Sequence, residues 1–171
     1  MGVFYTLNTI GQQVILSDAE NVKLPQRAEK LNKQQALSYV GKKFNNDKMA
    51  LYTIKNANTN QLYKVDNVLI SFFTANRSVE DDHLNKLKKG LDETSKNDKT
   101  YTSSIRTVNE NQILITHYSR SDIEYYDFFC FSGNKSNLTN AVSGGLQFAK
   151  ADHDNGTVIL TDILNSLKFV K

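Results

Sequence analysis

The sequence of 171 residues has the length of one domain with a single hydrophobic core, and we expect that domain to cover residues 1–171. Its 21 Lys and Arg residues nearly balance 18 Asp and Glu residues, which argues against a nucleic-acid partner. Cys130 is the single cysteine, so an internal disulfide is excluded. The sequence also lacks a run of about 18 apolar residues, and we therefore expect no integral membrane segment.

The N-terminal part of the chain predicts a strand pair followed by a helix. Residues 3–7 and 12–16 have the character of two strands joined by a turn. Asn32 is expected to be the N-cap of the helix, because Gln35 follows at the third helical position and completes the capping-box pattern. We expect this helix to have about three turns.

Residues 49–54 and 68–74 are predicted as the next strands. The second of these segments is almost continuously apolar, which is typical of a central strand covered on both faces. Ser78 is predicted to cap a second helix. The apolar stripe of that helix consists of Leu84, Leu87 and Leu91.

A meander of three strands is predicted at residues 101–108, 112–118 and 123–131. The turns between these segments are too short for a parallel return, so the strands must form antiparallel hairpins. Residues 142–148 predict one more strand.

The chain closes with a predicted amphipathic helix at residues 157–170, capped by Asp152 or Asp154. Ile163, Leu164 and Leu167 lie on its apolar stripe and should seal one face of the sheet. The order of elements indicates an α+β fold, with an antiparallel sheet covered by helices.

Two segments near the C-terminus resemble the PsbP-like fold group. They are Gly-Gly-Leu-Gln-Phe at residues 144–148 and Ile-Leu-Asn-Ser-Leu-Lys-Phe at residues 163–169, the latter being similar to the closing helix of that group. The group includes bacterial DcrB-type envelope lipoproteins and adaptor chaperones of type VI secretion. The resemblance implies a PsbP-like α+β fold and a protein that binds other proteins or assemblies without catalysis.

The histidines and the cysteine give no recognisable catalytic or metal motif. His83, His117 and His153 lack the i, i+4 helical spacing of a metal site, so we interpret them as surface or strand residues and expect no metal and no cofactor. A small hydrolase that uses Cys130 or a histidine, with His117 as the base for Cys130, is the alternative. The aromatic and acidic neighbours of Cys130 would not favour a thiolate.

Aromatic residues of the meander are the candidates for a binding surface. We predict that Tyr118, Tyr126 and Phe128 contact a partner protein, because exposed aromatic side chains are favoured binding anchors. Tyr126 and Phe128 share one face of their strand, and we expect this face to be the more exposed one, since Glu124 lies on it. Phe129 and Phe131 on the opposite face are assigned to the core.

Together these features predict a non-catalytic protein-binding module of a bacterial envelope or secretion-related system. We expect the partner to be another protein. The composition, rich in Lys and Asn, is typical of bacteria, and the envelope, with a trimmed export signal, is favoured over the cytoplasm. The resemblance to DcrB-type proteins and a myristoylation-like pattern at residues 1–6 leave lipid attachment as a further hypothesis.

Overall fold

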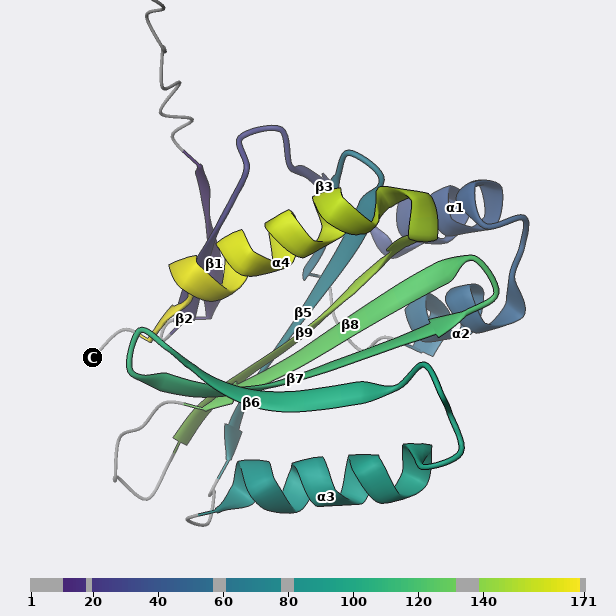
Figure 1. Cartoon of the computed structure of the whole chain (residues 1–171). Coiled ribbons are helices and arrows are strands. Elements are labelled where there is room, and N and C mark those ends of the chain that lie inside the picture. The colour runs from purple at the N-terminus through teal and green to yellow at the C-terminus, as the bar shows by residue number, and fades with distance from the viewer. Residues whose placement is uncertain (1–10, 18–19, 57–60, 78–81, 132–138, 170–171) are drawn as a thin grey trace, which may run out of the picture.

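The centre of the protein is a seven-stranded antiparallel sheet (Figure 1). The computed structural model describes residues 11–17, 20–56, 61–77, 82–131 and 139–169. In spatial order the strands are β3 (Glu29–Leu31), β4 (Gln61–Val65), β5 (Val68–Arg77), β9 (Thr139–Ala149), β8 (Ile123–Phe131), β7 (Asn111–Arg120) and β6 (Thr102–Val108). Helices cover this sheet, and the predicted α+β class is confirmed.

The three-strand meander β6-β7-β8 has the antiparallel pairing that its short turns predict. Asn109 and Glu110 have φ values of 48° and 67°, the left-handed backbone that lets a two-residue hairpin follow the twist of its strands. Ser121, with φ of 51°, opens the next two-residue turn. In the predicted central strand β5, Ile70 and Phe72 face one side of the sheet and Leu69 faces the other.

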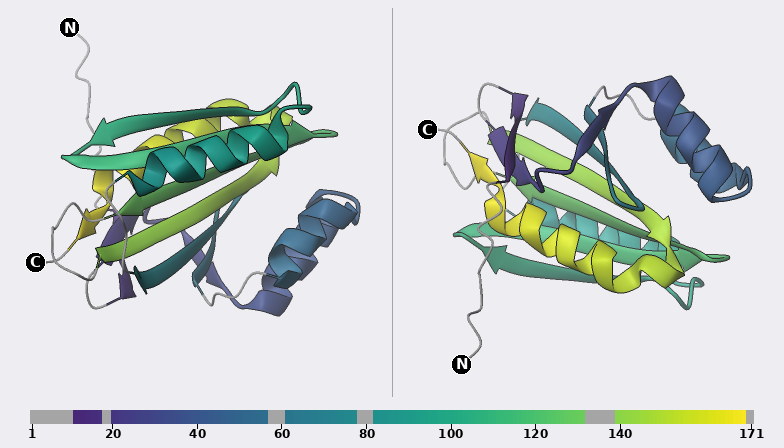
Figure 2. Two further views of the ribbon diagram at one scale, coloured as in Figure 1. Left: turned by 90° about the horizontal axis from the view of Figure 1, so that it is seen from below. Right: turned by 90° about the horizontal axis from the view of Figure 1, so that it is seen from above.

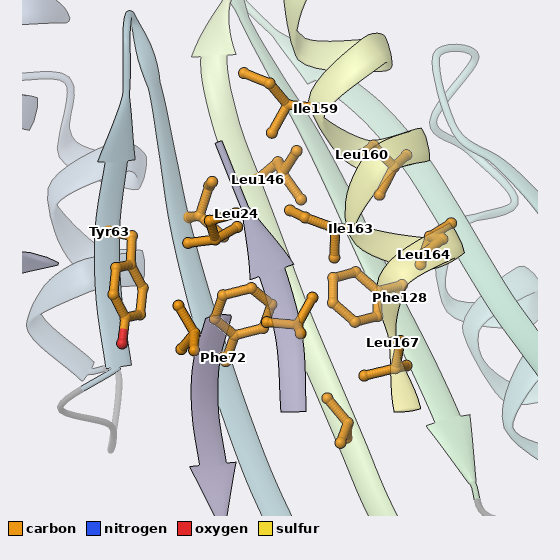
Figure 3. Close-up of a cluster of buried hydrophobic side chains, with 14 of the residues drawn as sticks. Leu24, Tyr63, Phe72, Phe128, Leu146, Ile159, Leu160, Ile163, Leu164 and Leu167 are labelled. Carbon is orange, nitrogen blue, oxygen red and sulfur yellow. The ribbon is translucent and has the colours of Figure 1, made fainter. Parts of the chain in front are cut away.

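One face of the sheet, here called the closed face, is covered by α4 (His153–Ser166) and a second, three-stranded sheet (Figure 2). The strands of the second sheet are β1 (Gln12–Ser17), β2 (Glu20–Leu24) and β10 (Lys168–Phe169). Figure 3 shows apolar side chains of α4, among them Ile163 and Leu164, packed beside Phe128 of β8. Ile163 is fully buried, so the predicted closing helix does seal one face of the sheet.

The ends of α4 differ from the prediction. After the short 3-10 helix η1 (Lys150–Asp152), α4 begins at His153, and the side chain of Asp152 makes no capping bond. The carboxylate of Asp152 instead accepts a hydrogen bond from Asn67 and pairs with Lys43 at 3.1 Å. The backbone is extended at Leu167, and Phe169 belongs to β10, which pairs with β2 rather than continuing the helix.

The opposite face, here called the split face, is covered by helices at its two ends (Figure 2). The helices α1 (Lys33–Lys43) and α2 (Lys48–Asn56) pack on one end through buried side chains such as Val40 and Ile54, against Leu62 and Leu69 of the sheet. The helix α3 (His83–Ser95) packs over β6 and β7 at the other end. The middle of this face, on β8 and β9, lies between the two groups of helices.

The prediction for α1 is confirmed in detail, whereas that for α2 is wrong. Asn32 accepts a hydrogen bond from the backbone of Gln35, whose side chain bonds back to complete the capping box. Residues 49–54, predicted as a strand, belong to α2. The carboxylate of Asp47 accepts a 2.9 Å hydrogen bond from the backbone of Ala50 at the start of α2, and Ala50 and Ile54 form its buried stripe. Short apolar runs do not distinguish a strand from a helix by pattern alone. The predicted strand at residues 3–7 and the predicted cap Ser78 lie outside the described residues.

Candidate binding groove

A groove runs across the middle of the split face, between α2 and α3. Its deeper part has a volume of about 330 Å³ and is floored by β5, β9 and β8. An adjoining cavity of about 250 Å³ extends it toward α3, and both parts are lined by Tyr118, Asp127 and Phe129. The deeper part alone is in the size range of small-molecule and side-chain pockets.

Two adjacent glycines of β9 shape the sheet at this point. Gly145 pairs with Asp127 on one side and with Ser71 on the other. A Cβ atom at Gly145 would lie 2.9 Å from Asp127 Oδ1 and 3.3 Å from Ser71 Oγ, so the glycine leaves room for the carboxylate on the groove floor. Gly144 faces the closed side, where the Phe128 ring fills the position of the missing Cβ.

Asp127 is the charged group of the deep groove. Its carboxylate has no hydrogen bond and no ion pair to any residue that the structure describes. Burial raises the pKa of Asp127 to about 6 from an ordinary value near 3.8. The side chain is therefore mostly ionised at neutral pH, at a cost in free energy that no neighbouring cation in the described part of the chain offsets.

Gln147 and Tyr125 add uncharged polar groups to the same floor. Gln147 is only 4% exposed, and neither its amide nitrogen nor its amide oxygen has a hydrogen-bond partner among the described residues. The hydroxyl of Tyr125 is also buried without such a partner, and its ring stacks on that of Tyr118 at 4.9 Å. Buried polar side chains nearly always have a partner. Gln147 and Asp127 therefore mark a place where a ligand can supply the missing bonds.

The walls of the groove are mainly apolar. Ile54 of α2, Leu69 and Phe73 of β5 and Phe129 of β8 contribute to the deep part. Arg120 lies at the outer end of the adjoining cavity, where it is exposed and makes no ion pair with Asp127. An apolar pocket with a few convergent polar groups and a carboxylate of perturbed pKa has the general character of a binding site.

On the closed face the buried carboxylate of Glu124 is bonded to two histidines through one of its oxygens. Glu124 is 8% exposed, and its Oε2 atom lies 3.2 Å from His117 Nε2 and 2.7 Å from His153 Nδ1. The bond to Glu124 raises the pKa of His153. This cluster ties the start of α4 to β7 and β8. Within the described ranges there is no group of three or more His, Cys, Asp or Glu side chains suited to hold a metal ion.

The structure places the predicted binding residues on both faces. Tyr118 lines the groove. Phe128 is fully buried in the core under α4, and Tyr126 is half-buried, with its ring stacked on those of His117 and Phe148. The expectation that the Tyr126 and Phe128 face is the more exposed one is therefore wrong. The expectation assumed that burial of the Glu124 carboxylate without a partner would be costly. The two histidines bond this carboxylate and so remove that cost.

Phe129 and Phe131, assigned to the core from the sequence, are half-buried on the split face. Phe129 lines the groove, and Phe131 lies edge-on against the His83 ring of α3 at 5.1 Å between ring centroids. The shared face of these residues was predicted correctly, but the larger core lies on the other side, because α4 and the β1-β2-β10 sheet cover it together.

The nucleophile pair of the hydrolase alternative does not form. Cys130 is opposite Ile113 in the ladder, whereas His117 is opposite Tyr126, four residues or about 13 Å further along β8. Burial raises the pKa of the Cys130 thiol to about 12, which is the reverse of what a thiolate nucleophile needs. The structure thus separates the two residues that this alternative required to be close together.

Asp127 and Gln147 were not recognised as site residues from the sequence. The available signal was the position of Asp127 between Tyr125 and Phe129, where a charged residue interrupts an aromatic face of the strand. A glycine pair directly before Gln147 was a second signal, because glycine within a strand often marks a place where another group approaches closely.

No protein-family model and no curated protein matches the sequence. Among solved structures, the fold is similar to the crystal structure of LpqN, which is involved in cell envelope biogenesis of Mycobacterium tuberculosis. The TM-score is 0.53 at 9% sequence identity, over 96% of this chain and 88% of LpqN. This likeness shows a shared α+β fold. The resemblance to the PsbP-like group stays a prediction. No helix in the described part of the chain is long and apolar enough to cross a membrane.

Proposed function

We propose that this protein is a non-catalytic binding protein of a bacterial envelope or secretion-related system, and that the groove on its split face holds a segment of another protein. The observation that carries the proposal is Gln147, which is buried in the groove floor with both amide atoms unpartnered within the described structure. A partner that enters the groove would provide those hydrogen bonds, and it would displace water from apolar walls at the same time.

The location in the envelope is supported by the fold. LpqN, which has a similar fold, is involved in envelope biogenesis, and an envelope role for this chain is compatible with that likeness. A bacterial origin and attachment to a lipid are parts of the same proposal.

A non-catalytic role is supported by the chemistry of the groove. Its described lining contains no histidine, lysine or cysteine that could activate Ser71 or Ser143 as a nucleophile. A carboxylate, an amide and tyrosine hydroxyls on apolar walls are groups that recognise and orient a ligand.

Of the aromatic residues proposed as anchors, Tyr118 is the one whose position in the groove allows direct contact with the partner. Tyr126 and Phe128 would act indirectly, through the packing that holds β8 in place. Their contribution to binding stays a prediction.

A site-specific photo-crosslinker tests the proposal in cells of the organism that encodes the protein. Thr53 is an exposed residue on the groove rim, and Val158 is an exposed residue of α4 on the other side of the molecule. We expect a benzoylphenylalanine at position 53 to capture one protein that the same residue at position 158 does not. Gly145→Val, which fills the groove floor, should remove that product, and the purified partner should bind the unmodified protein but not Gly145→Val. Equal capture from both positions, or capture that survives Gly145→Val in a folded protein, would show that the groove is not the binding site.

A further inference from the structure

We propose that the groove recognises a primary ammonium group at the end of an apolar chain, and that in a partner protein this group is a lysine side chain bound by Asp127. The inference deepens the proposed function and depends on it for the kind of partner. It rests on the charges, the hydrogen-bonding groups and the walls of the groove.

The charge of the groove selects for a cation. Asp127 is the only described residue lining the deep part that is charged at neutral pH, since burial raises the pKa of Tyr125 to about 12 and that of Tyr118 still further. At the outer end, exposed Arg120 is accompanied by Asp98 and forms no ion pair with Asp127. A bound ammonium would compensate the partly desolvated carboxylate, whereas a carboxylate ligand would be repelled.

The hydrogen-bonding groups match a donor with several N–H bonds. Asp127 Oδ1 lies over Gly145, with Ser71 Oγ on the other side of that glycine and Gln147 on the same face two residues along β9. These positions offer a carboxylate oxygen, a hydroxyl oxygen and an unpartnered amide oxygen. An ammonium has three donors and no acceptor, so it can bond to acceptors that converge from different directions.

The walls of the groove suit a flexible aliphatic stem. Ile54, Leu69 and Phe129 line the deep part, where methylene groups of a lysine can pack while the charged end reaches the floor. Lysine fits this geometry better than arginine, because the acceptors come from Asp127, Ser71 and Gln147 and not from the carboxylate alone. A compact ammonium can direct its three donors to such converging acceptors, whereas a guanidinium holds its donors in one plane.

Titration of the isotope-labelled full chain with three six-carbon probes at pH 7.5 tests the chemistry. The probes are n-hexylammonium, 1-hexanol and hexanoate, and backbone NMR shifts report the site. We expect hexylammonium to shift Ser71, Gly145 and Gln147 and to bind at least ten-fold more tightly than hexanol, with hexanoate the weakest. Equal affinity of hexylammonium and hexanol, or shifts confined to other regions, would overturn the proposal.

Two matched variants identify the group responsible. Asp127→Asn should reduce the affinity for hexylammonium to that for hexanol, while Glu124→Gln, three residues away on the closed face, should leave the preference unchanged. The dispersion of the NMR spectra checks that both variants are folded. If Glu124→Gln also loses the preference in a folded protein, the preference does not come from Asp127. Gly145→Val provides a third variant, in which the space beside Asp127 is filled and all binding should be lost.

A peptide pair distinguishes a lysine of a partner protein from a free amine. Acetyl-Leu-Lys-Leu-amide should bind in the groove and compete with hexylammonium, and the peptide with norleucine in place of Lys should bind at least ten-fold more weakly. If hexylammonium binds but the lysine peptide does not, the lysine assignment is wrong. If none of the probes binds while capture from position 53 is still lost in Gly145→Val, the ammonium chemistry is wrong and the proposed function stands.

Discussion

Glu124 and Asp127 lie three residues apart on β8 and point to opposite faces of the same sheet. Glu124 lies on the closed face, where two histidines bond its carboxylate. Asp127 lies on the split face and has no such partner in the described structure. The closed face is covered by α4 and a second sheet, whereas helices cover the split face only at its ends. Burial alone thus does not indicate a functional acid: Glu124 is the more buried of the two, and what distinguishes half-buried Asp127 is the lack of a partner among the described residues.

The two carboxylates of β8 thus have different roles, one in the fold and one in the groove. The Glu124 cluster joins α4 to the meander and supports the fold. Gln147 and the Tyr125 hydroxyl lower the stability of the split face, because each is removed from water without a compensating bond from the described residues. Half-buried Asp127 adds to this cost, because its carboxylate is partly desolvated without a cation beside it. Natural proteins accept such local costs at sites where a ligand restores the missing interactions.

The largest change in stability is expected from a substitution on the closed face. Ile163→Ala should lower the free energy of unfolding by about 2–5 kcal/mol, because a fully buried side chain is lost and the neighbouring core cannot fill the space. Val158→Ala, at an exposed position of the same helix, is the matched control and should change stability by less than about 0.5 kcal/mol. Chemical denaturation measures both. Equal effects of the two variants would mean that α4 does not seal this face.

Neutralising the two carboxylates should change stability in opposite directions. Glu124→Gln is expected to destabilise the protein by about 1–3 kcal/mol, because it weakens two hydrogen bonds to a buried charge. Asp127→Asn is expected to stabilise it by about 1–3 kcal/mol at pH 8, because the uncompensated charge is removed. Denaturation curves at pH 8 test the pair, and a destabilising Asp127→Asn in a folded protein would show that Asp127 has a structural partner.

The difference in stability between Asp127→Asn and the wild type should depend on pH. The folded pKa of Asp127, about 6, is raised above its ordinary value of 3.8, so its contribution to stability is fully present below pH 3.8 and is lost as the pH rises through 6. The advantage of Asp127→Asn should therefore grow between pH 4 and pH 7. A constant difference between variant and wild type over this range would contradict the raised pKa.

Tyr126→Ala should cost about 1–2 kcal/mol, because its half-buried ring stacks on His117 and Phe148. The sequence predicted this ring on the more exposed face, where its removal would have had little effect on stability. Calorimetry measures the change, and an unaltered melting temperature would mean that the ring is not part of the closed-face packing.

The smallest effect concerns His153, whose side chain is about half exposed. Its folded pKa is raised by Glu124, so its contribution is fully present below its ordinary value of 6.5 and is lost as the pH rises through the higher folded pKa. His153→Gln should remove this loss above pH 6.5. The pH dependence of His153→Gln is best compared with that of its parent in an Asp127→Asn background, because Asp127 itself also lowers the stability of the protein as the pH rises.

The sequence was sufficient to predict features that depend on local patterns. The capping box at Asn32, the hairpins of the meander and the apolar stripe of α4 follow from residue spacing, and all were predicted. The choice of the buried face of β8 was not, because it depends on His117 and His153 approaching Glu124 from distant parts of the chain. The groove could not be predicted either, because its walls come from α2 and α3, which are far apart in the sequence. In addition, residues 49–54 of α2 have a pattern that predicts a strand.

The central claim is that Asp127 is kept without a partner so that a cation can bind it, and the pKa of its carboxyl group tests this claim most directly. NMR titration of the Asp127 side-chain carbon should give a pKa near 6 in the free protein. Saturation with n-hexylammonium should lower that pKa, because the bound cation stabilises the ionised form. An ordinary pKa in the free protein, or one that hexylammonium leaves unchanged, would contradict the account.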